Sequence, residues 1–372
     1  MFIASLRNSV FLFGSGSSRL GRGPPISANG LPLKKQAENQ TLSRLTELRH
    51  TIADYPEIIT LVTFAFIFLF FATAAPDTFL SAFALSNILT FGGITGVVVI
   101  GVAFLMISGE FDLSIGSTLA VASYVFALAL VGGVPAVPAM LLALVVSALL
   151  GLVNGLIVAY SRIPSFIVTL GTLFAYRGLA RILGEGTAVK YTPDELPGLF
   201  TYLNGSLTWL NNLFDPAGNF RASSLWFMGL IVIMTVILER TRYGNWNFAT
   251  GGNALAARSQ GVNIKAVKII NFIISGGLAG LAGILIFSQR NSATPLAGAG
   301  MELIAVAAAV IGGVRLTGGY GTIIGASIGV LLMSMLEQGL ALLGIPNEIF
   351  RAVAGFIIIV TVAVNTYLRK GE

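Results

Sequence analysis

The chain is 372 residues long; 55% of its residues are hydrophobic and only 10% are charged. Soluble domains carry roughly 25% charged residues, so this composition excludes an ordinary globular enzyme and indicates an integral membrane protein. The net charge of +6 does not require nucleic acid, because basic residues concentrated in cytoplasmic loops give membrane proteins the same balance.

Residues 1–50 combine Gly/Ser/Pro-rich pieces with scattered Lys and Arg. The apolar run Phe2–Phe13 is interrupted by Arg7 and Asn8, so it is too short for the apolar core of about 7–15 residues that a signal peptide needs. We interpret residues 1–50 as a flexible cytoplasmic extension, part of which can reflect a generous choice of start codon. An interfacial amphipathic segment is the alternative.

Residues 51–372 are predicted to form one all-α transmembrane domain. A helix needs ~20 apolar residues to cross the hydrocarbon core, and ten stretches qualify as candidates, which predicts a helical bundle of about ten spans. The sixth and eighth are short, so they are expected to be tilted, broken or partly re-entrant. The ten stretches are Glu57–Ala75, Asn87–Ile107, Leu113–Val131, Val137–Tyr160, Phe166–Leu183, Leu225–Leu238, Val267–Ser288, Met301–Val314, Thr322–Leu343 and Ile349–Tyr367.

Charge predicts the orientation. If the chain starts in the cytoplasm, ten spans place most of the Lys and Arg residues, and both termini, on the cytoplasmic side. The loop 239–268 then lies inside. The loop 184–224, rich in Asn, Gly, Pro and aromatic residues, lies on the extracytoplasmic side.

Small residues recur at four-residue spacing inside the spans. In lipid such pairs let helices approach closely, which predicts a tightly packed bundle. The sets are Gly92/Gly96, Gly151/Gly155, Gly276/Gly280 and Gly321/Gly325/Gly329.

The loop 239–268 is the most polar segment between two apolar regions and contains a short helix of its own. Asn253 is a plausible N-cap, Ala254–Gln260 are mostly good helix formers, and Gly261 can end the helix in the left-handed conformation. Such a helix can serve as a handle for a cytoplasmic partner. The alternative is an ordinary solvated loop.

The segment Gly109–Ser117 places Glu110 and Asp112 between two apolar runs. An isolated charge at the membrane centre costs roughly 2.5–3.5 kcal/mol, so these carboxylates must face water, protein partners or a translocation cavity. The alternative is a tight turn at the cytoplasmic interface in which Asp112 N-caps the next span. Both interpretations stand for Asp112, and the turn is favoured for Glu110.

Other polar side chains lie inside apolar spans, and each fits two interpretations. They can line a hydrophilic path for a hydroxylated solute, or form helix–helix hydrogen bonds, which average about 0.6 kcal/mol. These residues are Asn154, Asn271, Glu302, Glu337 and Gln338.

Motifs for chemistry are missing from the chain. No G-x-x-x-x-G-K-[ST] sequence occurs, so the chain does not bind ATP through a P-loop, and there is no H-E-x-x-H. Cysteine is absent and His50 is the single histidine, which excludes disulfides and thiolate metal sites. We therefore expect no catalytic residue, metal or cofactor in this chain, and nothing argues for an intramembrane enzyme.

Several collinear segments resemble one family. GEFDLSIGS (Gly109–Ser117) resembles the GGIDLSVGS-type motif of permease subunits in ribose- and xylose-type ABC sugar importers. Thr169–Gly186 is similar to that family's TLGT…RGL segment, and Arg242–Lys268 to its cytoplasmic RxGRxxxAxGGNxxAAxxSGI loop. The resemblance covers residues 55–368 and continues through Ser275–Leu285, Ala305–Ala326 and Gly339–Ile345.

The resemblance implies a permease domain of about ten spans that pairs with a second permease, a copy or a homologue. Two cytoplasmic ATPase subunits would bind the ATP and Mg, and a soluble binding protein would deliver solute to the outer loop 184–224 and to Gln289–Gly300. Asn253–Gly261 would be the coupling helix, with ATPase contacts at Asn253, Ala254, Ala256, Ala257, Arg258 and Gly261. The pathway candidates are Glu110, Asp112, Ser114, Asn154, Asn271 and Glu302.

The chain departs from the family pattern at Glu110 and Phe111, where Gly and Ile are common, and at Gly244–Trp246, which replaces Gly-Arg-Tyr. Ala254–Ala256 also lacks the acidic residue often seen before the Ala pair. The expected function is import of a monosaccharide or small polyol across a bacterial cytoplasmic membrane. Alternatives are a nucleoside, a branched-chain amino acid or a furanose signal as solute, or a secondary transporter driven by an ion gradient.

Overall fold

The computed structural model describes residues 56–214, 218–346, 349–350, 352–357, 359 and 363. The chain divides into two units between Thr51 and Ile52, and only the second unit is described below. The predicted extension 1–50 lies outside the described residues, and so does much of the tenth predicted span, Ile349–Tyr367.

The described part of the chain is predominantly helical, as the composition predicts. Its only strands, β1 (Val189–Lys190) and β2 (Ser292–Ala293), form a small antiparallel pair. The named helices in chain order are α2 (Pro56–Ala74), α3 (Pro76–Phe79), α4 (Ala82–Ile107), α5 (Ile115–Val131), α6 (Ala136–Ser161), α7 (Ser165–Leu183), α8 (Leu199–Asn204), α9 (Thr208–Phe214), α10 (Ala222–Arg240), α11 (Arg242–Gly252), α12 (Ala254–Ser259), α13 (Ile264–Arg290), α14 (Met301–Ile311) and α15 (Ile323–Leu342).

Six of the described helices are long and apolar enough to cross a membrane, namely α4, α6, α7, α10, α13 and α15. Three shorter apolar helices, Thr60–Ala74 within α2, α5 and α14, coincide with three further predicted spans. The predicted total of about ten is therefore not confirmed by the residues that the structure describes.

The two spans predicted to be short differ in outcome. The sixth span, Leu225–Leu238, was predicted to be short, and this prediction is wrong because α10 is 19 residues long. The helix also includes the polar residues Ser223 and Ser224 at its start and Glu239 and Arg240 at its end. The prediction counted only the apolar run and therefore left these residues out. The shortness of the eighth span is confirmed, since α14 has only 11 residues.

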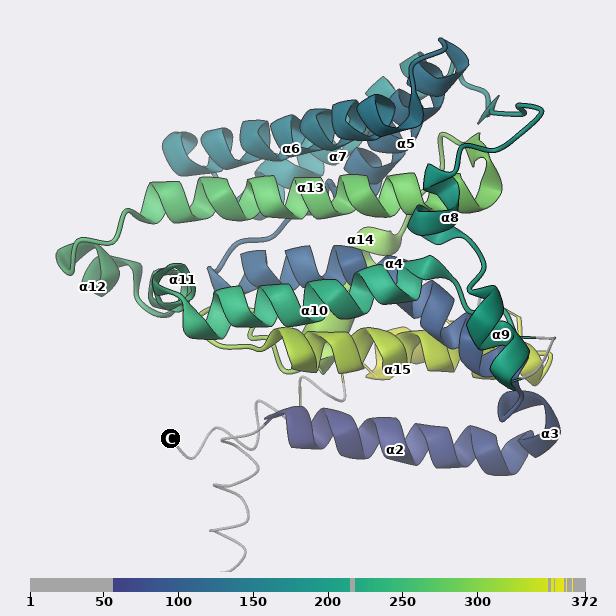
Figure 1. Cartoon of the computed structure of the whole chain (residues 1–372). Coiled ribbons are helices and arrows are strands. Elements are labelled where there is room, and N and C mark those ends of the chain that lie inside the picture. The colour runs from purple at the N-terminus through teal and green to yellow at the C-terminus, as the bar shows by residue number, and fades with distance from the viewer. Residues whose placement is uncertain are drawn as a thin grey trace, which may run out of the picture. The chain divides into compact units, whose positions relative to one another are not determined.

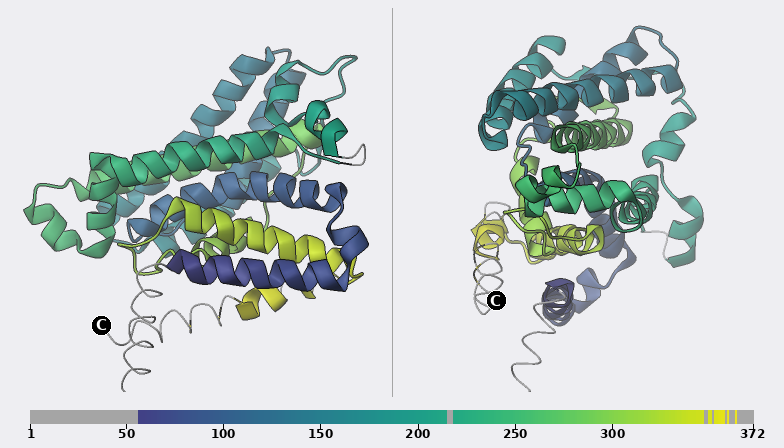
Figure 2. Two further views of the ribbon diagram at one scale, coloured as in Figure 1. Left: turned by 60° about the horizontal axis from the view of Figure 1, so that its bottom comes forward. Right: turned by 90° about the vertical axis from the view of Figure 1, so that its left-hand side faces the viewer.

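Helix α13 lies at the centre of the bundle and packs against α4, α5 and α6 (Figure 1). On the other side of α4 lie α10 and α15. Helices α11 and α12 gather at one end of the long helices, called the α12 end here, and α8 and α9 lie at the opposite end. The right-hand view of Figure 2 looks along α13 and α15, which are seen nearly end-on.

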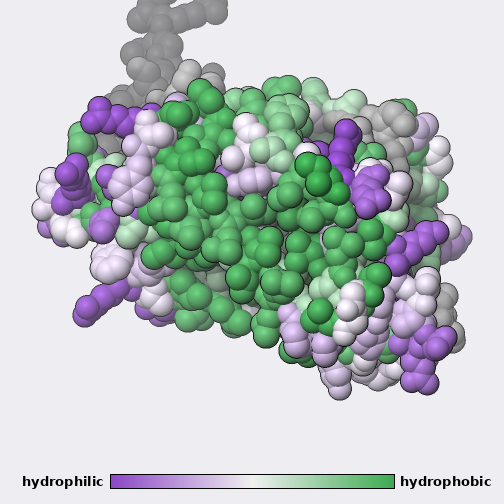
Figure 3. Space-filling model, turned by 90° about the horizontal axis from the view of Figure 1, so that it is seen from above, coloured by the Kyte–Doolittle hydropathy of each residue, from purple (hydrophilic) through white to green (hydrophobic). Residues whose placement is uncertain are grey.

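The helices differ in how much of their surface is covered. Helix α4 has 89% of its apolar span buried, whereas α6 has 33% and α7 only 22%. The exposed faces of α6 and α7 carry Leu141, Val145, Phe166 and Phe174. Figure 3 shows a broad apolar surface between two hydrophilic ends, the distribution that a bilayer requires of a spanning bundle.

The glycines at four-residue spacing make the predicted close contacts between α6 and α13. A Cβ added to Gly151 would run into the carbonyl group of Phe272, and one added to Gly276 would lie 2.6 Å from the carbonyl oxygen of Ser147. At Gly155 an added Cβ would lie 2.9 Å from the Cα of Ile269. The two backbones therefore touch, as small residues allow in membrane helices.

Replacing Gly151 with alanine is expected to lower the free energy of unfolding by about 1–3 kcal/mol, because a backbone atom blocks the added methyl group. The matched control is Gly171→Ala in α7, where nothing lies within 4 Å of the added Cβ. That change should be neutral or stabilising, since alanine favours helix. Thermal unfolding of the two variants in detergent measures the difference; equal midpoints would contradict the close α6–α13 contact.

Candidate functional site

Two turns meet through their backbones at the α12 end: the turn after α4 and the loop between α14 and α15. Gly109, which follows α4, has φ 83°, and Gly318 and Gly319 have φ 80° and 75°, values that favour glycine. The amide of Gly319 donates to the carbonyl of Ile107 at 2.8 Å, and a Cβ on Gly318 would lie 2.8 Å from the Cα of Gly109. The turn 108–114 is therefore held by the loop between α14 and α15.

Asp112 in this turn is bound by protein groups. Its Oδ1 accepts hydrogen bonds from the amide (2.9 Å) and hydroxyl (2.6 Å) of Ser114, and its Oδ2 accepts from the hydroxyl of Ser275 in α13 at 3.3 Å. Asp112 is 1% exposed. Of the three environments expected for this carboxylate (water, protein partners or a translocation cavity), the structure shows protein partners.

The predicted N-cap role of Asp112 is wrong. Ser114 occupies the N-cap position of α5, and its side chain makes no capping hydrogen bond. Asp112 instead accepts a hydrogen bond from the amide of Ser114, two residues further along, as in an Asx turn. It is too far from the helix to cap it, because α5 begins only at Ile115.

Ser114 and Asn154 extend the contacts of Asp112 into α6 and α7. The amide nitrogen of Asn154 donates to the Ser114 hydroxyl at 2.8 Å, and the Tyr176 hydroxyl donates to Asn154 Oδ1 at 3.1 Å. Asn154 and Ser114 are fully buried. The contacts described for Asn154 are thus helix–helix hydrogen bonds. Tyr176 and Ser275, which belong to this network, were not among the predicted site residues.

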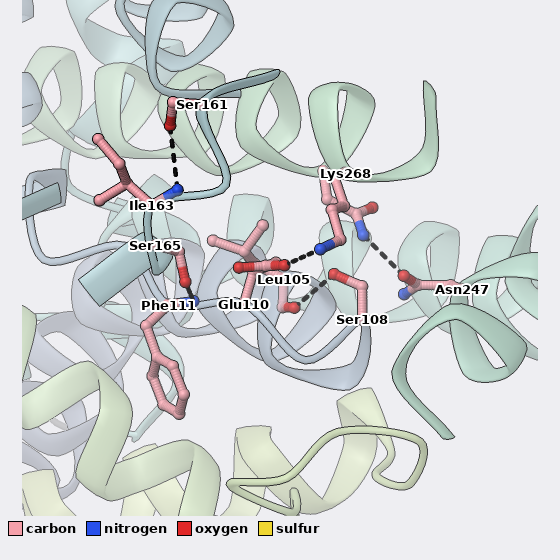
Figure 4. Close-up of polar contacts among 10 residues, drawn as sticks. Leu105, Ser108, Glu110, Phe111, Ser161, Ile163, Ser165, Asn247 and Lys268 are labelled. Atoms are coloured by element: carbon pink, nitrogen blue, oxygen red, sulfur yellow. Dashed lines mark hydrogen bonds and ion pairs between the residues drawn. The ribbon is translucent and has the colours of Figure 1, made fainter. Parts of the chain in front are cut away.

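Glu110 forms an ion pair with Lys268 of α13, and Figure 4 shows the two side chains pointing toward one another. The amide of the next residue, Phe111, donates to the hydroxyl of Ser165 at the start of α7 at 3.0 Å. Glu110 thus lies in a turn, the interpretation favoured for it. Within the described residues this is the only ion pair, and Lys268 was not among the predicted site residues.

Asn271 belongs to a second polar cluster, which joins α11 to the bundle. Its amide nitrogen donates to Asn247 Oδ1 at 2.6 Å, and its Oδ1 accepts from the Tyr243 hydroxyl at 2.6 Å. Asn247 also donates to the carbonyl of Phe104 in α4 at 3.0 Å. Burial raises the pKa of the Tyr243 phenol. Asn247 and Tyr243 were not among the predicted site residues.

Glu302, in the first turn of α14, differs from the other candidates because one carboxylate oxygen is free. Its Oε1 accepts from the amide of Gly300 at 3.1 Å, while Oε2 is buried without a hydrogen-bond partner. A Cβ on Gly116 in α5 would lie 2.5 Å from Oε2. Glu302 Oε2 therefore lies against the first turn of α5, at the place where the short helices α5 and α14 both begin.

Helix α12 has the caps that the sequence predicts. Asn253 Oδ1 accepts the amide of Ala256 at 3.0 Å, and Gly261 has φ 84°. The amide of Val262 donates back to Ala257 at 3.1 Å, which completes the helix end. The helix ends at Ser259, one residue before the predicted Gln260.

The residues of α12 divide into a buried and an exposed set. Ala257 is 5% exposed, whereas Leu255 is 80% exposed. Asn253, Ala254, Ala256, Arg258 and Gly261 are also exposed. Leu255 is thus a highly exposed apolar side chain on α12, and it was not among the predicted site residues.

The two segments predicted to receive a binding protein lie side by side at the end opposite α12. Val189 and Lys190 of the loop 184–224 pair with Ala293 and Ser292 of Gln289–Gly300. Arg177 of α7 further fixes the second segment, donating to the carbonyls of Pro295 (3.0 Å) and Ala297 (2.8 Å).

Residues 84–362 match the family described as "Branched-chain amino acid transport system / permease component". The chain belongs to this permease family. It is 35% identical over 271 residues to the autoinducer 2 import system permease protein LsrC of Photorhabdus luminescens, covering 73% of this chain and 78% of the relative.

Two permeases of Escherichia coli K12 are also similar to this chain. The ribose import permease protein RbsC is 34% identical over 295 residues, covering 79% of this chain and 88% of its own. The xylose transport system permease protein XylH is 30% identical over 353 residues, covering 82% and 90%. No solved structure matches the chain significantly.

Replacing Tyr243 with phenylalanine removes the hydrogen bond to Asn271 and should lower the free energy of unfolding by about 1 kcal/mol near neutral pH. Because burial raises the pKa of Tyr243, the folded protein binds the phenolic proton more tightly than the unfolded chain. The wild-type advantage is therefore present below the unfolded pKa of about 10 and is lost as pH rises above it.

Unfolding in detergent from about pH 8 to about pH 11 should show the difference between wild type and Tyr243→Phe shrinking. A difference that stays constant across this range would contradict the burial of the phenol.

Proposed function

We propose that this chain is the membrane-spanning permease subunit of an ABC importer that carries a monosaccharide or related small polyol into a bacterial cytoplasm. The observation that carries the proposal is the similarity to the ribose and xylose permeases over 79% and 82% of the chain. A separate subunit would bind ATP and Mg and hydrolyse the nucleotide. The α12 end would be cytoplasmic, with both termini on that side.

Coupling would run from α12 through α13. The caps at Asn253 and Gly261 make α12 a defined short helix, and Leu255 offers an apolar contact for a groove on the ATPase. Closure of an ATPase pair is a two-state movement that a seated helix can transmit. Only four residues separate α12 from α13, and α13 contacts the turn 108–114 through Lys268 and Ser275.

The proposed pathway runs beside Glu302. Its free Oε2 can accept a hydrogen bond from a solute hydroxyl, and it lies where α5 and α14, both short, begin. Helices that start within the membrane commonly form the solute sites of transporters. Glu110, Asp112, Ser114, Asn154 and Asn271 would act differently, supporting the walls through the contacts described for them.

A binding protein would dock on the surface formed by the β1–β2 pair and its flanking loops, and a second permease, a copy or a homologue, would complete the pathway. The alternative solute with most support is a furanose signal, because the LsrC relative, at 35% identity, is named for autoinducer 2. A nucleoside or a branched-chain amino acid remains a further alternative. A calorimetric screen of the cognate binding protein separates these solutes.

Reconstitution tests the mechanism. The permease in proteoliposomes with its ATPase and binding protein should take up the solute only when ATP is hydrolysed. Uptake that persists with a hydrolysis-dead ATPase would overturn the ABC assignment and favour a secondary transporter driven by an ion gradient.

Replacing Leu255 with glutamate should weaken binding of the ATPase subunit by about tenfold or more, because an exposed apolar contact becomes charged. The permease should still insert and keep its thermal stability, since Leu255 is 80% exposed. Co-purification of the ATPase in detergent measures the effect.

The matched control is Leu196→Glu, an exposed leucine in the loop 184–224 at the opposite end, which should leave ATPase binding unchanged. Equal ATPase binding by the Leu255 variant and the wild type would show that α12 is not the handle.

A further inference from the structure

A basic crevice of about 630 Å³ lies at the α12 end, between the end of α6 and the corner that joins α12 to α13. Its cations come from three parts of the chain: Arg162 follows α6, Arg258 lies on α12, and Lys265 and Lys268 lie in the first turns of α13. Four cations around one hollow repel one another, and anions are the groups that relieve this repulsion.

Among the residues that the structure describes, a carboxylate neutralises one of these four charges. Lys268 pairs with Glu110. The Lys265 ammonium lies 4.2 Å from the ring centroid of Tyr160, a contact that leaves its positive charge in place. In the part of the chain that the structure describes, neither Arg162, Arg258 nor Lys265 forms an ion pair. The crevice thus presents three cations without carboxylate partners.

The surface beside the crevice is apolar. Tyr160, Ile163, Phe166 and Ile167 at the adjoining ends of α6 and α7 are 65%, 42%, 53% and 57% exposed. Figure 3 shows that the apolar surface gives way to hydrophilic residues at the end where α12 lies. The crevice therefore opens at the boundary between apolar and polar surface, the level at which lipid headgroups lie.

We propose that this crevice binds the phosphate headgroup of an anionic phospholipid. The headgroup would accept hydrogen bonds from Arg162 and Lys265, and the acyl chains would lie along the exposed apolar side chains of α6 and α7. Basic pockets between membrane helices bind phosphate headgroups in this way. A soluble protein partner fits less well, because it would leave the apolar edge of the crevice uncovered.

One consequence concerns the proposed coupling helix. A bound phosphate can bridge Arg162, on the α6–α7 connection, and Arg258, on α12, two segments that have no ion pair between them. The lipid would then hold α12 against α6, so the lipid composition of the membrane would affect the position of α12.

Native mass spectrometry of the full-length permease in detergent tests the proposal with added palmitoyl-oleoyl phosphatidylglycerol or phosphatidylcholine. The anionic lipid should bind more tightly. The double variant R162Q/K265Q should lose affinity for phosphatidylglycerol by about 25-fold, since each cation near a membrane surface contributes about a fivefold gain. Phosphatidylcholine binding should change little.

Two control variants separate charge at this place from charge in general. Arg240→Gln removes an exposed cation at the end of α10, outside the crevice, and should keep the preference for phosphatidylglycerol. The charge-preserving variant R162K/K265R should also keep it. Should R162Q/K265Q fail to fold, the wild-type comparison of the two lipids and the single variants R162Q and K265Q decide the question.

Four results would overturn the proposal. The first is equal wild-type affinity for the two lipids, and the second is an equal loss in Arg240→Gln. The third is displacement of phosphatidylglycerol by millimolar inorganic phosphate, which would identify a site for free anions. Loss of ATPase binding by R162Q/K265Q with lipid binding unchanged would likewise assign the crevice to a protein partner. None of these results bears on which solute is transported.

Discussion

The backbone contact between α6 and α13 holds the rest of the bundle in register. It exists because Gly151 and Gly276 carry no side chain, so the two helices approach more closely than larger residues allow. At this separation α13 brings Ser275 to Asp112 and Lys268 to Glu110. If α13 moved away from the turn 108–114, Glu110 would lose Lys268 and Asp112 would keep only its hydrogen bonds from Ser114, and a buried charge with fewer partners is costly. The position of α13 therefore has to satisfy two requirements at once: close contact with α6 at the glycines, and hydrogen bonds or ion pairs to Asp112 and Glu110.

The same helix connects the core to the α12 end. Its first turns line the basic crevice and follow α12 closely, its middle contacts the turn 108–114, and Asn271 binds the Asn247 side chain of α11. A four-residue connection joins α12 to α13, and side-chain hydrogen bonds and an ion pair join α13 to α11 and to the turn 108–114. A displacement of α12 would therefore reach the start of α5 through side chains that touch, which is the kind of contiguous contact that coupling between sites requires.

Local features were predicted well from sequence. The caps of α12 at Asn253 and Gly261 depend on backbone geometry within a few residues, and the apolar runs placed most helices to within a few residues. Partners across the bundle were not predicted: nothing in the neighbourhood of Asn247 or Tyr176 indicates that they bind Asn271 and Asn154. Such pairings depend on how whole helices align. The N-cap role predicted for Asp112 was wrong, because α5 begins at Ile115 and Ser114 holds the N-cap position.

The amino-acid sequence by itself determined that this is a membrane protein, where its apolar helices lie and which permease family it belongs to, because hydropathy and collinear motifs are properties of the chain alone. Only the tertiary structure decided which polar residues are committed to one another and which are free. Asp112 and Glu302 look alike as single acidic residues beside apolar runs, yet one carboxylate is bound on both oxygens and the other has an unpartnered oxygen. The physical reason is that a hydrogen bond depends on the distance between groups that packing brings together, and packing here joins residues more than 160 positions apart.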